Sequence, residues 1–304
     1  MDMQQLVILS GKGGTGKTSL TAAFAHLAET GSYPMSTVLA DADVDAANLE
    51  LLLDPQILKT EQFWGGQIAV IEPTACTGCG ECERVCRFDA IHISEFENTF
   101  FDIDPIACDG CAACVYQCPE GAISMQDQVV GKWFQSMSCY GPLFHAELRP
   151  AQENSGKLVT LVKQRARLFA LDEGYSLVII DGPPGIGCPV ISAASGADLA
   201  LIVAEPTMSG LHDMQRVFHT TDHFGIRSLV CVNKADLYPP AVTEIKTYCQ
   251  DHSIEFIGCI PFDEIVTDSM VRGQVVTAFQ PDSSASRAVQ AIWERLNNLL
   301  KESV

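Results

Sequence analysis

A glycine-rich loop near the start of the chain limits the possible folds more than any other feature of the sequence. Residues 11–18 are Gly-Lys-Gly-Gly-Thr-Gly-Lys-Thr, preceded by an apolar run at 6–9 and followed by a helical pattern at 17–29. Backbone amides and the start of a helix can surround a phosphate group only where glycines leave room. The spacing fits a nucleotide-phosphate loop and predicts a strand, the loop and a helix in that order.

The rest of the chain continues this alternation. Short apolar runs bounded by turn residues predict buried parallel strands at 38–40, 177–180, 199–204, 229–232 and 256–260. Helical periodicity recurs at 209–223, 241–252 and 284–301. We therefore expect an α/β fold with a doubly wound, mostly parallel sheet. The last helix has mixed charges opposite its apolar stripe, so we expect it to pack in the core and not to lie on a membrane.

Eight of the thirteen cysteines form two copies of one spacing, Cys-x2-Cys-x2-Cys-x3-Cys. This is the ligand spacing of two-cluster ferredoxins, in which the fourth cysteine of each run serves the other 4Fe-4S cluster. Zinc is the alternative, but zinc sites usually separate their cysteine pairs more widely. Arg87 follows the first run where a proline follows the second, so we expect the turns there to differ. The expected ligand sets are Cys76, Cys79, Cys82 and Cys118 for one cluster, and Cys108, Cys111, Cys114 and Cys86 for the other.

The cysteine runs lie in an interval, residues 63–129, that lacks the long helical patterns found elsewhere. We expect this interval to form an inserted, small α+β ferredoxin-like domain within a discontinuous nucleotide-binding domain at 1–62 and 130–304. The interval carries eleven acidic side chains and two basic ones, a balance of −9 out of a total of −19. An acidic surface of this kind is often only solvated, and the alternative is a docking patch for a basic redox partner.

Charge and cysteine usage exclude several classes of protein. A net charge of −19 argues against binding to nucleic acid, which needs clustered lysines and arginines. Thiols at metal-ligand spacing differ from the disulfide framework of short secreted chains, and we expect a reducing, anoxic compartment. The phosphate loop begins about ten residues from the start, and no apolar run approaches about 20 residues. We therefore expect a cytoplasmic protein with no stable membrane anchor.

The second lysine of the loop, Lys12, has no role in an ordinary phosphate loop. With it, the loop resembles the deviant Walker A motif of MinD/Mrp/ParA-type ATPases. In that family the early lysine reaches the partner subunit's nucleotide, so the resemblance implies an ATP-dependent homodimer, or a heterodimer with a paralogue. A solvated surface lysine is the alternative. The expected nucleotide-binding residues of the loop are Gly11, Lys12, Gly13, Gly14, Thr15, Gly16, Lys17, Thr18 and Ser19.

Within this motif, Lys17 is expected to reach the β and γ phosphates of ATP, and the Thr18 hydroxyl to complete the Mg²⁺ shell. Residues 41–49 resemble the family's first switch, which implies that Asp43 orients the attacking water and is catalytic together with Lys12 and Lys17. Asp41 and Asp45 are alternatives for binding Mg²⁺ or for structural roles. The remaining implied roles are Mg²⁺ binding by Asp181, at the end of a strand that resembles Walker B, and contacts to the adenine base by Asn233, Lys234, Pro261, Phe262 and Asp263.

One thiol outside the two runs has a possible role at a dimer interface. Cys188 follows Asp181 by seven residues, and the nitrogenase iron protein, a relative, carries a cluster ligand at the same offset. Cys188 could therefore bind a metal shared between subunits, or it could be a buried cysteine that packs as a small apolar residue. Cys139 is the other candidate ligand. The residues expected to be inert are Cys231, Cys249 and Cys259 in the core and His212 on a helix surface.

Over its full length the chain resembles MinD-superfamily P-loop ATPases that carry an inserted ferredoxin domain. The first hypothesis is a partner-stimulated ATPase whose ATP-dependent dimerisation is coupled to low-potential electron transfer, through two 4Fe-4S clusters, to a redox or metallocofactor partner protein. The second is a scaffold or carrier that assembles iron-sulfur clusters or other metallocofactors, with Cys188 as the transfer site. The third is a positioning ATPase like MinD, which predicts binding to lipid or to the nucleoid.

Overall fold

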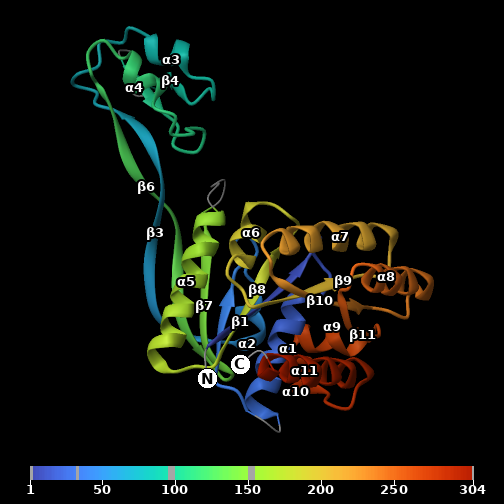
Figure 1. Cartoon of the computed structure of the whole chain (residues 1–304). Coiled ribbons are helices and arrows are strands. Elements are labelled where there is room, and N and C mark those ends of the chain that lie inside the picture. The colour runs from blue at the N-terminus through green and yellow to red at the C-terminus, as the bar shows by residue number, and fades with distance from the viewer. Residues whose placement is uncertain (1–2, 32–33, 95–99, 150–154, 303–304) are drawn as a thin grey trace. The chain divides into compact units, whose positions relative to one another are not determined.

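The computed structural model describes residues 3–31, 34–94, 100–149 and 155–302, and its elements are labelled in Figure 1. The chain divides into two compact units, which are described separately. Unit 1 comprises Met1–Glu61, Trp133–Glu147 and Ser155–Val304, and unit 2 comprises Gln62–Lys132 and Leu148–Asn154. Two long strands, β3 (Gln56–Ile71) and β6 (Ile123–Ser138), contribute residues to both units.

A large, mostly parallel sheet forms the centre of unit 1. Its strand order is β11-β10-β9-β1-β8-β2-β7-β6-β3, and every neighbouring pair from β11 to β7 is parallel. A two-residue turn at Cys139 and Tyr140 joins β6 to β7, and such a short connection makes the two strands antiparallel. The other strands are β1 (Gln4–Ser10), β2 (Thr37–Asp41), β7 (Gly141–Leu148), β8 (Leu177–Pro184), β9 (Leu199–Ala204), β10 (Arg227–Asn233) and β11 (Glu255–Ile260).

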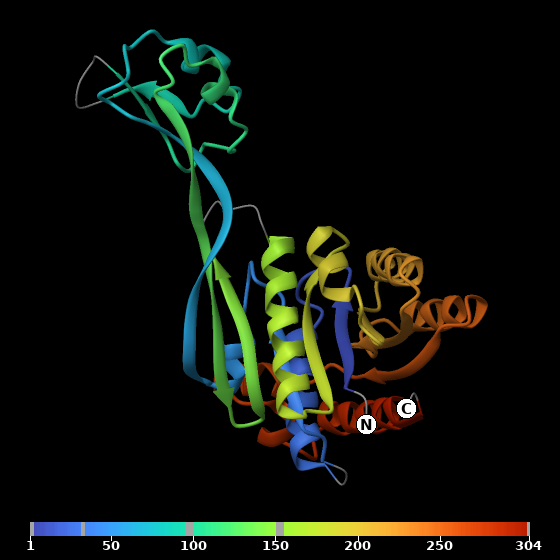
Figure 2. The same cartoon turned by 60° about the vertical axis from the view of Figure 1, so that its left-hand side comes forward.

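Helices cover both faces of this sheet, as a doubly wound fold requires (Figure 1). In Figure 2, α5 stands beside the β6–β7 hairpin, and the Arg165 guanidinium of α5 lies 5.0 Å from the Trp133 ring of β6. One layer contains α1 (Lys17–Thr30), α2 (Leu49–Leu53), α9 (Glu264–Val271), α10 (Val276–Phe279) and α11 (Ser284–Glu302). The other contains α5 (Ser155–Glu173), α6 (Cys188–Ala194), α7 (Met208–His223) and α8 (Pro239–Asp251).

The predicted strands and helices of the sheet are confirmed. The apolar runs form the central strands, since both faces of these strands are covered by helices. In β1, for example, all seven residues are buried. The packing of the last helix is also confirmed, since Trp293 of α11 is buried with its ring 5.2 Å from that of Phe24. None of the described helices is long and apolar enough to cross a membrane.

The sequence analysis did not predict β3, β6 or β7. In β3, exposed side chains such as Lys59 and Gln67 interrupt the apolar residues, so the strand has no continuous apolar run. Its length of 16 residues follows from its pairing with β6, which is equally long. Pairing between distant strands is a tertiary property that local patterns do not reveal.

Unit 2 repeats one small motif. A five-residue helix follows the second cysteine of each run, α3 (Glu81–Val85) in the first half and α4 (Ala113–Gln117) in the second. Both helices start after a left-handed residue, Gly80 (φ 77°) or Ala112 (φ 60°). An antiparallel pair, β4 (Ile91–Ile93) and β5 (Phe101–Ile103), completes the unit's secondary structure among the described residues.

The turns after the two cysteine runs differ, as expected: the amide of Gly121 donates to the carbonyl of Cys118 at 3.3 Å, whereas residues 87–88 form only a bend. Cys86, which precedes Arg87, has φ −72° and ψ 117°. Cys118, which precedes a proline, has φ −72° and ψ 113°. Both cysteines have the extended backbone that a following proline favours, so the arginine leaves this part of the turn unchanged.

Candidate functional site

The phosphate loop connects β1 to α1 at the carboxyl edge of the sheet. Gly14 (φ 76°) and Gly16 (φ 94°) take the left-handed conformation that side chains disfavour. A Cβ on Gly16 would also lie 2.5 Å from Nδ2 of Asn233. The same Nδ2 donates a hydrogen bond to the carbonyl of Thr15 at 2.8 Å. The end of β10 therefore holds the loop open, and only glycine fits beneath it.

A cleft with an empty volume of about 1800 Å³, partly open to solvent, lies at this edge. It contains most of the predicted nucleotide-binding residues, together with an apolar wall that the sequence analysis missed. The predicted residues that line it are Gly13, Gly14, Gly16, Lys17, Thr18, Ser19, Asp43, Asp45, Asn233, Lys234, Pro261, Phe262 and Asp263. The wall consists of Leu51, Leu52, Val266 and Met270, and these residues belong to no motif that could have revealed them.

Lys17 is a buried cation surrounded by carboxylates. Its Nζ donates a hydrogen bond to Ser10 Oγ at 2.9 Å, and Ser10 Oγ donates in turn to the carbonyl of Lys12 at 2.7 Å. Burial lowers the pKa of Lys17, while the charges of Asp181, Asp43 and Asp41 oppose that shift. A bound phosphate would offer this ammonium a stronger acceptor than a neutral hydroxyl.

Asp181 has one carboxylate oxygen without a hydrogen-bond partner among the described residues. Thr18 donates to this carboxylate, and Thr21 Oγ1 donates to Oδ1 at 3.2 Å. Oδ2 is buried and has no hydrogen-bond partner among the described residues. Burial raises the pKa of Asp181 to about 6, because the hydrogen bonds from Thr18 and Thr21 and the charge of Lys17 only partly compensate for the lost hydration. An orphaned carboxylate oxygen beside the Thr18 hydroxyl fits an oxygen-ligand Mg²⁺ site.

Asp41 pairs with Asp181 in the β2–β8 register, but its oxygens are already occupied. Oδ2 accepts from the amides of Asn48 (3.2 Å) and Leu49 (3.0 Å), and Oδ1 accepts from the amide of Asp43 (3.1 Å). Burial and the nearby Asp181 raise its pKa well above the usual range. These bonds shape the segment that carries Asp43 into the cleft, which favours a structural role for Asp41.

Asp43 itself lines the cleft, where burial raises its pKa and the charge of Lys17 opposes that shift.

Two residues of the phosphate loop, Gly11 and Lys12, contact other parts of the protein and do not line the cleft. A Cβ on Gly11 would lie 2.3 Å from Cβ of Asp213, so this glycine serves packing against α7. Lys12 is paired with Glu205 at the end of β9, with Nζ 2.8 Å from Oε2. The predicted residues outside the cleft lining are Gly11, Lys12, Thr15, Asp41 and Asp181.

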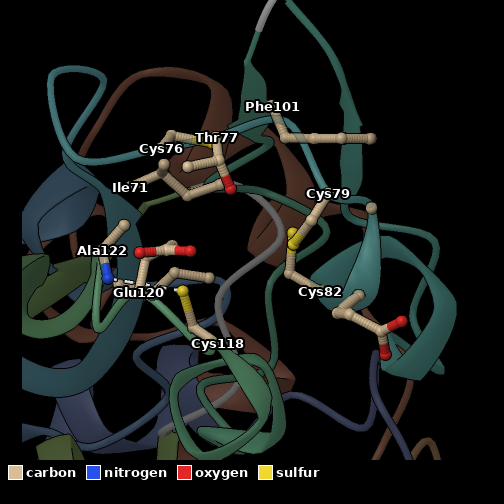
Figure 3. Close-up of a pocket in the computed structure, with 12 residues that line it drawn as sticks. Ile71, Cys76, Thr77, Cys79, Cys82, Phe101, Cys118, Glu120 and Ala122 are labelled. Carbon is tan, nitrogen blue, oxygen red and sulfur yellow. Dashed lines mark hydrogen bonds between the residues drawn. The ribbon is translucent and has the colours of Figure 1, made fainter.

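The eight cysteines of unit 2 surround two separate cavities, each with an empty volume of about 330 Å³. Each cavity takes three thiols from one run and the fourth from the other run. Figure 3 shows the first thiol cavity, where Cys118 Sγ also accepts the amide of Ala122 at 3.3 Å. The first thiol cavity is lined by Cys76, Cys79, Cys82 and Cys118. The second thiol cavity is lined by Cys86, Cys108, Cys111 and Cys114.

The lining of each cavity can be compared with the donors that a 4Fe-4S cluster needs. No three His, Cys, Asp or Glu side chains within the described ranges are grouped as ligands of one metal ion. In a 4Fe-4S cluster the four cysteine thiolates bind different irons, so their sulfur atoms do not converge on one point. Four thiols around each cavity, with Ile71, Ala122 and Ile123 in the lining of the first, match this donor set.

Cysteines outside unit 2 occupy different environments. Cys231 and Cys249 are buried, as predicted, and burial raises their pKa values to about 12 and about 11. Cys259 is only half-buried, so the expectation of an inert core position was too simple. Cys188 is exposed at the start of α6, which excludes the buried alternative. Cys139 and His212 are also exposed.

The geometry of the cleft agrees with comparisons to known proteins. The family described as the CobQ/CobB/MinD/ParA nucleotide binding domain matches residues 6–276. The chain belongs to this family. It is an ATP-binding P-loop protein of the MinD/ParA type, with the large, mostly parallel sheet of that group.

Relatives of this MinD/ParA-type ATPase include proteins with different descriptions. The protein MJ0578 of Methanocaldococcus jannaschii is 32% identical over 302 residues, which are 98% of each chain. The cytosolic Fe-S cluster assembly factor NBP35 of Eremothecium gossypii is 26% identical over 155 residues, covering 45% of this chain and 46% of that protein. The structure of MinD from Pyrococcus horikoshii, complexed with Mg-ADP, has a TM-score of 0.59, 18% identity and 99% coverage of both chains, which shows a shared fold.

Proposed function

We propose that this MinD/ParA-type ATPase couples ATP hydrolysis and ATP-dependent dimerisation to low-potential electron transfer, through two 4Fe-4S clusters, to a partner protein. The observation that carries the proposal is the pair of thiol cavities in a chain that also holds an ATP cleft. A bound 4Fe-4S cluster supplies one-electron chemistry at a potential tuned by its surroundings. Residues 63–129 would be the ferredoxin-like domain, inserted between 1–62 and 130–304.

The roles proposed for the ATP cleft rest on its contacts together with the family resemblance. Lys17 would exchange Ser10 for the β and γ phosphates, and Thr18 and Asp181 would hold Mg²⁺. Asp43, at the cleft wall, orients the attacking water, because phosphoryl transfer depends mainly on alignment and charge stabilisation. Lys12 reaches the nucleotide of a second subunit, a homodimer partner or a paralogue. Asn233 and residues 261–263 flank the base.

The roles in unit 2 are to bind and shield the clusters. Four cysteines hold each cluster, and apolar side chains such as Ile71 and Ile123 keep water from it. The acidic surface of residues 63–129 would steer a basic redox or metallocofactor partner, with no role for nucleic acid.

Each cluster is assigned three cysteines from one run and one cysteine from the other run. Double substitutions test this assignment. Anaerobically purified protein should contain about eight irons, and a single Cys82→Ser, Cys118→Ser or Cys86→Ser change should remove about four. Cys82→Ser combined with Cys118→Ser should remove no more than either alone, because both serve one cluster. Cys82→Ser combined with Cys86→Ser should remove nearly all iron. Cys139→Ser is the matched control.

Iron and sulfide analysis with electron paramagnetic resonance of the reduced protein measures these outcomes. A stoichiometric zinc content without iron would refute the cluster assignment.

The coupling is tested by ATP turnover, which should differ between protein with reduced clusters and protein with oxidised clusters. Turnover that ignores the redox state while both clusters are intact would refute the coupling but leave the clusters in place.

A second candidate is an iron-sulfur or metallocofactor assembly scaffold or carrier. It is favoured by the partial similarity to NBP35 and by the exposure of Cys188. In this case Cys188→Ala should abolish iron bound beyond the eight of the thiol cavities, while Cys139→Ala should not. A third candidate, a positioning ATPase, fits the MinD fold equally well and predicts ATP-dependent sedimentation with liposomes.

A further inference from the structure

Glu205 pairs with two lysines at the edge of the phosphate loop. It follows the last residue of β9, and its side chain is only 13% exposed. Its Oε2 lies 2.8 Å from Nζ of Lys12, and its Oε1 lies 2.7 Å from Nζ of Lys234. One carboxylate therefore compensates two ammonium groups, one from the phosphate loop and one from the segment after β10.

The backbone around Glu205 is fixed. Its carbonyl accepts the amide of Thr207 at 2.8 Å, and Thr207 Oγ1 caps α7 by accepting the amide of Gly210 at 2.9 Å. A Cβ on Gly210 would lie 2.3 Å from the Glu205 carbonyl oxygen, so α7 packs directly on this turn. The backbone that carries the Glu205 side chain is therefore held in place beside α7.

The two lysines differ in how firmly they are held. Lys234 has a left-handed backbone (φ 54°), and its Nζ also lies 3.3 Å from the carbonyl of Gly14. Among the residues that the structure describes, Glu205 is the only partner of the Lys12 side chain, and the side chain of Lys12 is 36% exposed. Lys12 can therefore leave Glu205 by side-chain rotation, whereas Lys234 stays tied to the loop.

We propose that Glu205 is a positioning residue that holds Lys12 within its own subunit and thereby sets the ATP concentration at which the protein dimerises. The inference rests on the proposed dimer, in which Lys12 reaches the partner subunit's nucleotide. An ammonium paired with Glu205 must give up that pair to reach another phosphate, because both acceptors compete for the same donors. Lys234 remains on Glu205 and keeps the carboxylate neutralised after Lys12 leaves.

The charges at this site agree with the geometry. Burial raises the pKa of Glu205, but hydrogen bonds from Lys12 and Lys234 outweigh it, and the pKa is lowered overall. The carboxylate is therefore ionised at neutral pH, and replacement by the isosteric amide removes the charge without changing the shape of the side chain.

The test is dimerisation driven by a non-hydrolysable ATP analogue and followed by analytical ultracentrifugation. Glu205→Gln should dimerise at an analogue concentration roughly twofold to fivefold below that of the wild type, the size expected for a partly exposed charge pair. In a Lys12→Ala background the same substitution should cause no shift. Glu255→Gln, which removes the exposed pair with Arg227 (3.0 Å), is the matched control and should behave as the wild type.

Acylation of lysine amines, measured by mass spectrometry, tests directly whether Glu205 restrains the amine of Lys12. Lys12 of the nucleotide-free wild type should react more slowly than Lys12 of Glu205→Gln, and the control variant should match the wild type. Equal reactivity in all three, or a dimerisation shift that persists without Lys12, would overturn the role of Glu205. If the wild type stays monomeric with the analogue, the proposed dimer is wrong. If the wild type dimerises but Glu205→Gln does so at the same analogue concentration, only the role of Glu205 is wrong.

Discussion

A buried histidine makes the stability of unit 1 sensitive to acid. His145 on β7 is 1% exposed and stacks on Phe134 with ring centroids 4.9 Å apart. Its Nε2 lies 2.9 Å from Ser136 Oγ, and its Nδ1 lies 3.2 Å from Oε2 of Glu50. Burial lowers the pKa of His145 to about 4, because the imidazolium would lose its hydration.

The size and sign of the effect follow from proton linkage. The unfolded chain binds the proton of this histidine near pH 6.5, and the folded protein binds it only near pH 4. Between these values the unfolded chain holds more protons, so the free energy of unfolding falls as the pH falls. The difference of about 2.5 pKa units corresponds to about 3 kcal/mol, present above pH 6.5 and lost on acidification to pH 4.

The assay compares urea unfolding of the wild type and His145→Gln at pH 7 and pH 4.5. The glutamine can still bond to Ser136 but does not titrate. The wild type should lose about 2.5 kcal/mol more than the variant between these two pH values. Buried acids such as Asp41 and Asp181 titrate in both proteins, so the comparison removes their contribution. An equal loss in both proteins would refute the reasoning and would mean that the charge of Glu50 outweighs burial.

Two further substitutions test packing and turn geometry. Arg87→Pro should leave the iron content unchanged and shift stability by less than about 1 kcal/mol, because Cys86 already has the backbone that precedes a proline; loss of one cluster would contradict this. Trp293→Ala should lower the free energy of unfolding by about 3 to 5 kcal/mol in urea titrations, because a large buried ring leaves a cavity beside Phe24. Glu294→Ala, exposed on the same helix, should change it by less than about 0.5 kcal/mol, and equal effects of the two would argue against core packing of α11.

Local sequence determined much of the nucleotide cleft. The order of strand, loop and helix around Gly11–Thr18 follows from apolar runs and glycines, because both act through neighbouring residues. The central strands were predictable for the same reason, since burial on both faces requires continuous apolar stretches. The grouping of three thiols from one run with a fourth from the other was expected from spacing alone, and two cavities with these linings exist.

Only the tertiary structure decided which distant side chains meet. Glu205 belongs to no motif, yet the strand order places the ends of β9 and β10 beside the phosphate loop and brings two lysines to one carboxylate. Asp41 and Asp181 look alike as strand-ending acids, but the fold gives three backbone amides to one and leaves an oxygen of the other without a partner. Sequence specifies spacing along the chain, whereas hydrogen bonding, burial and charge pairing depend on distances that exist only after the sheet has formed.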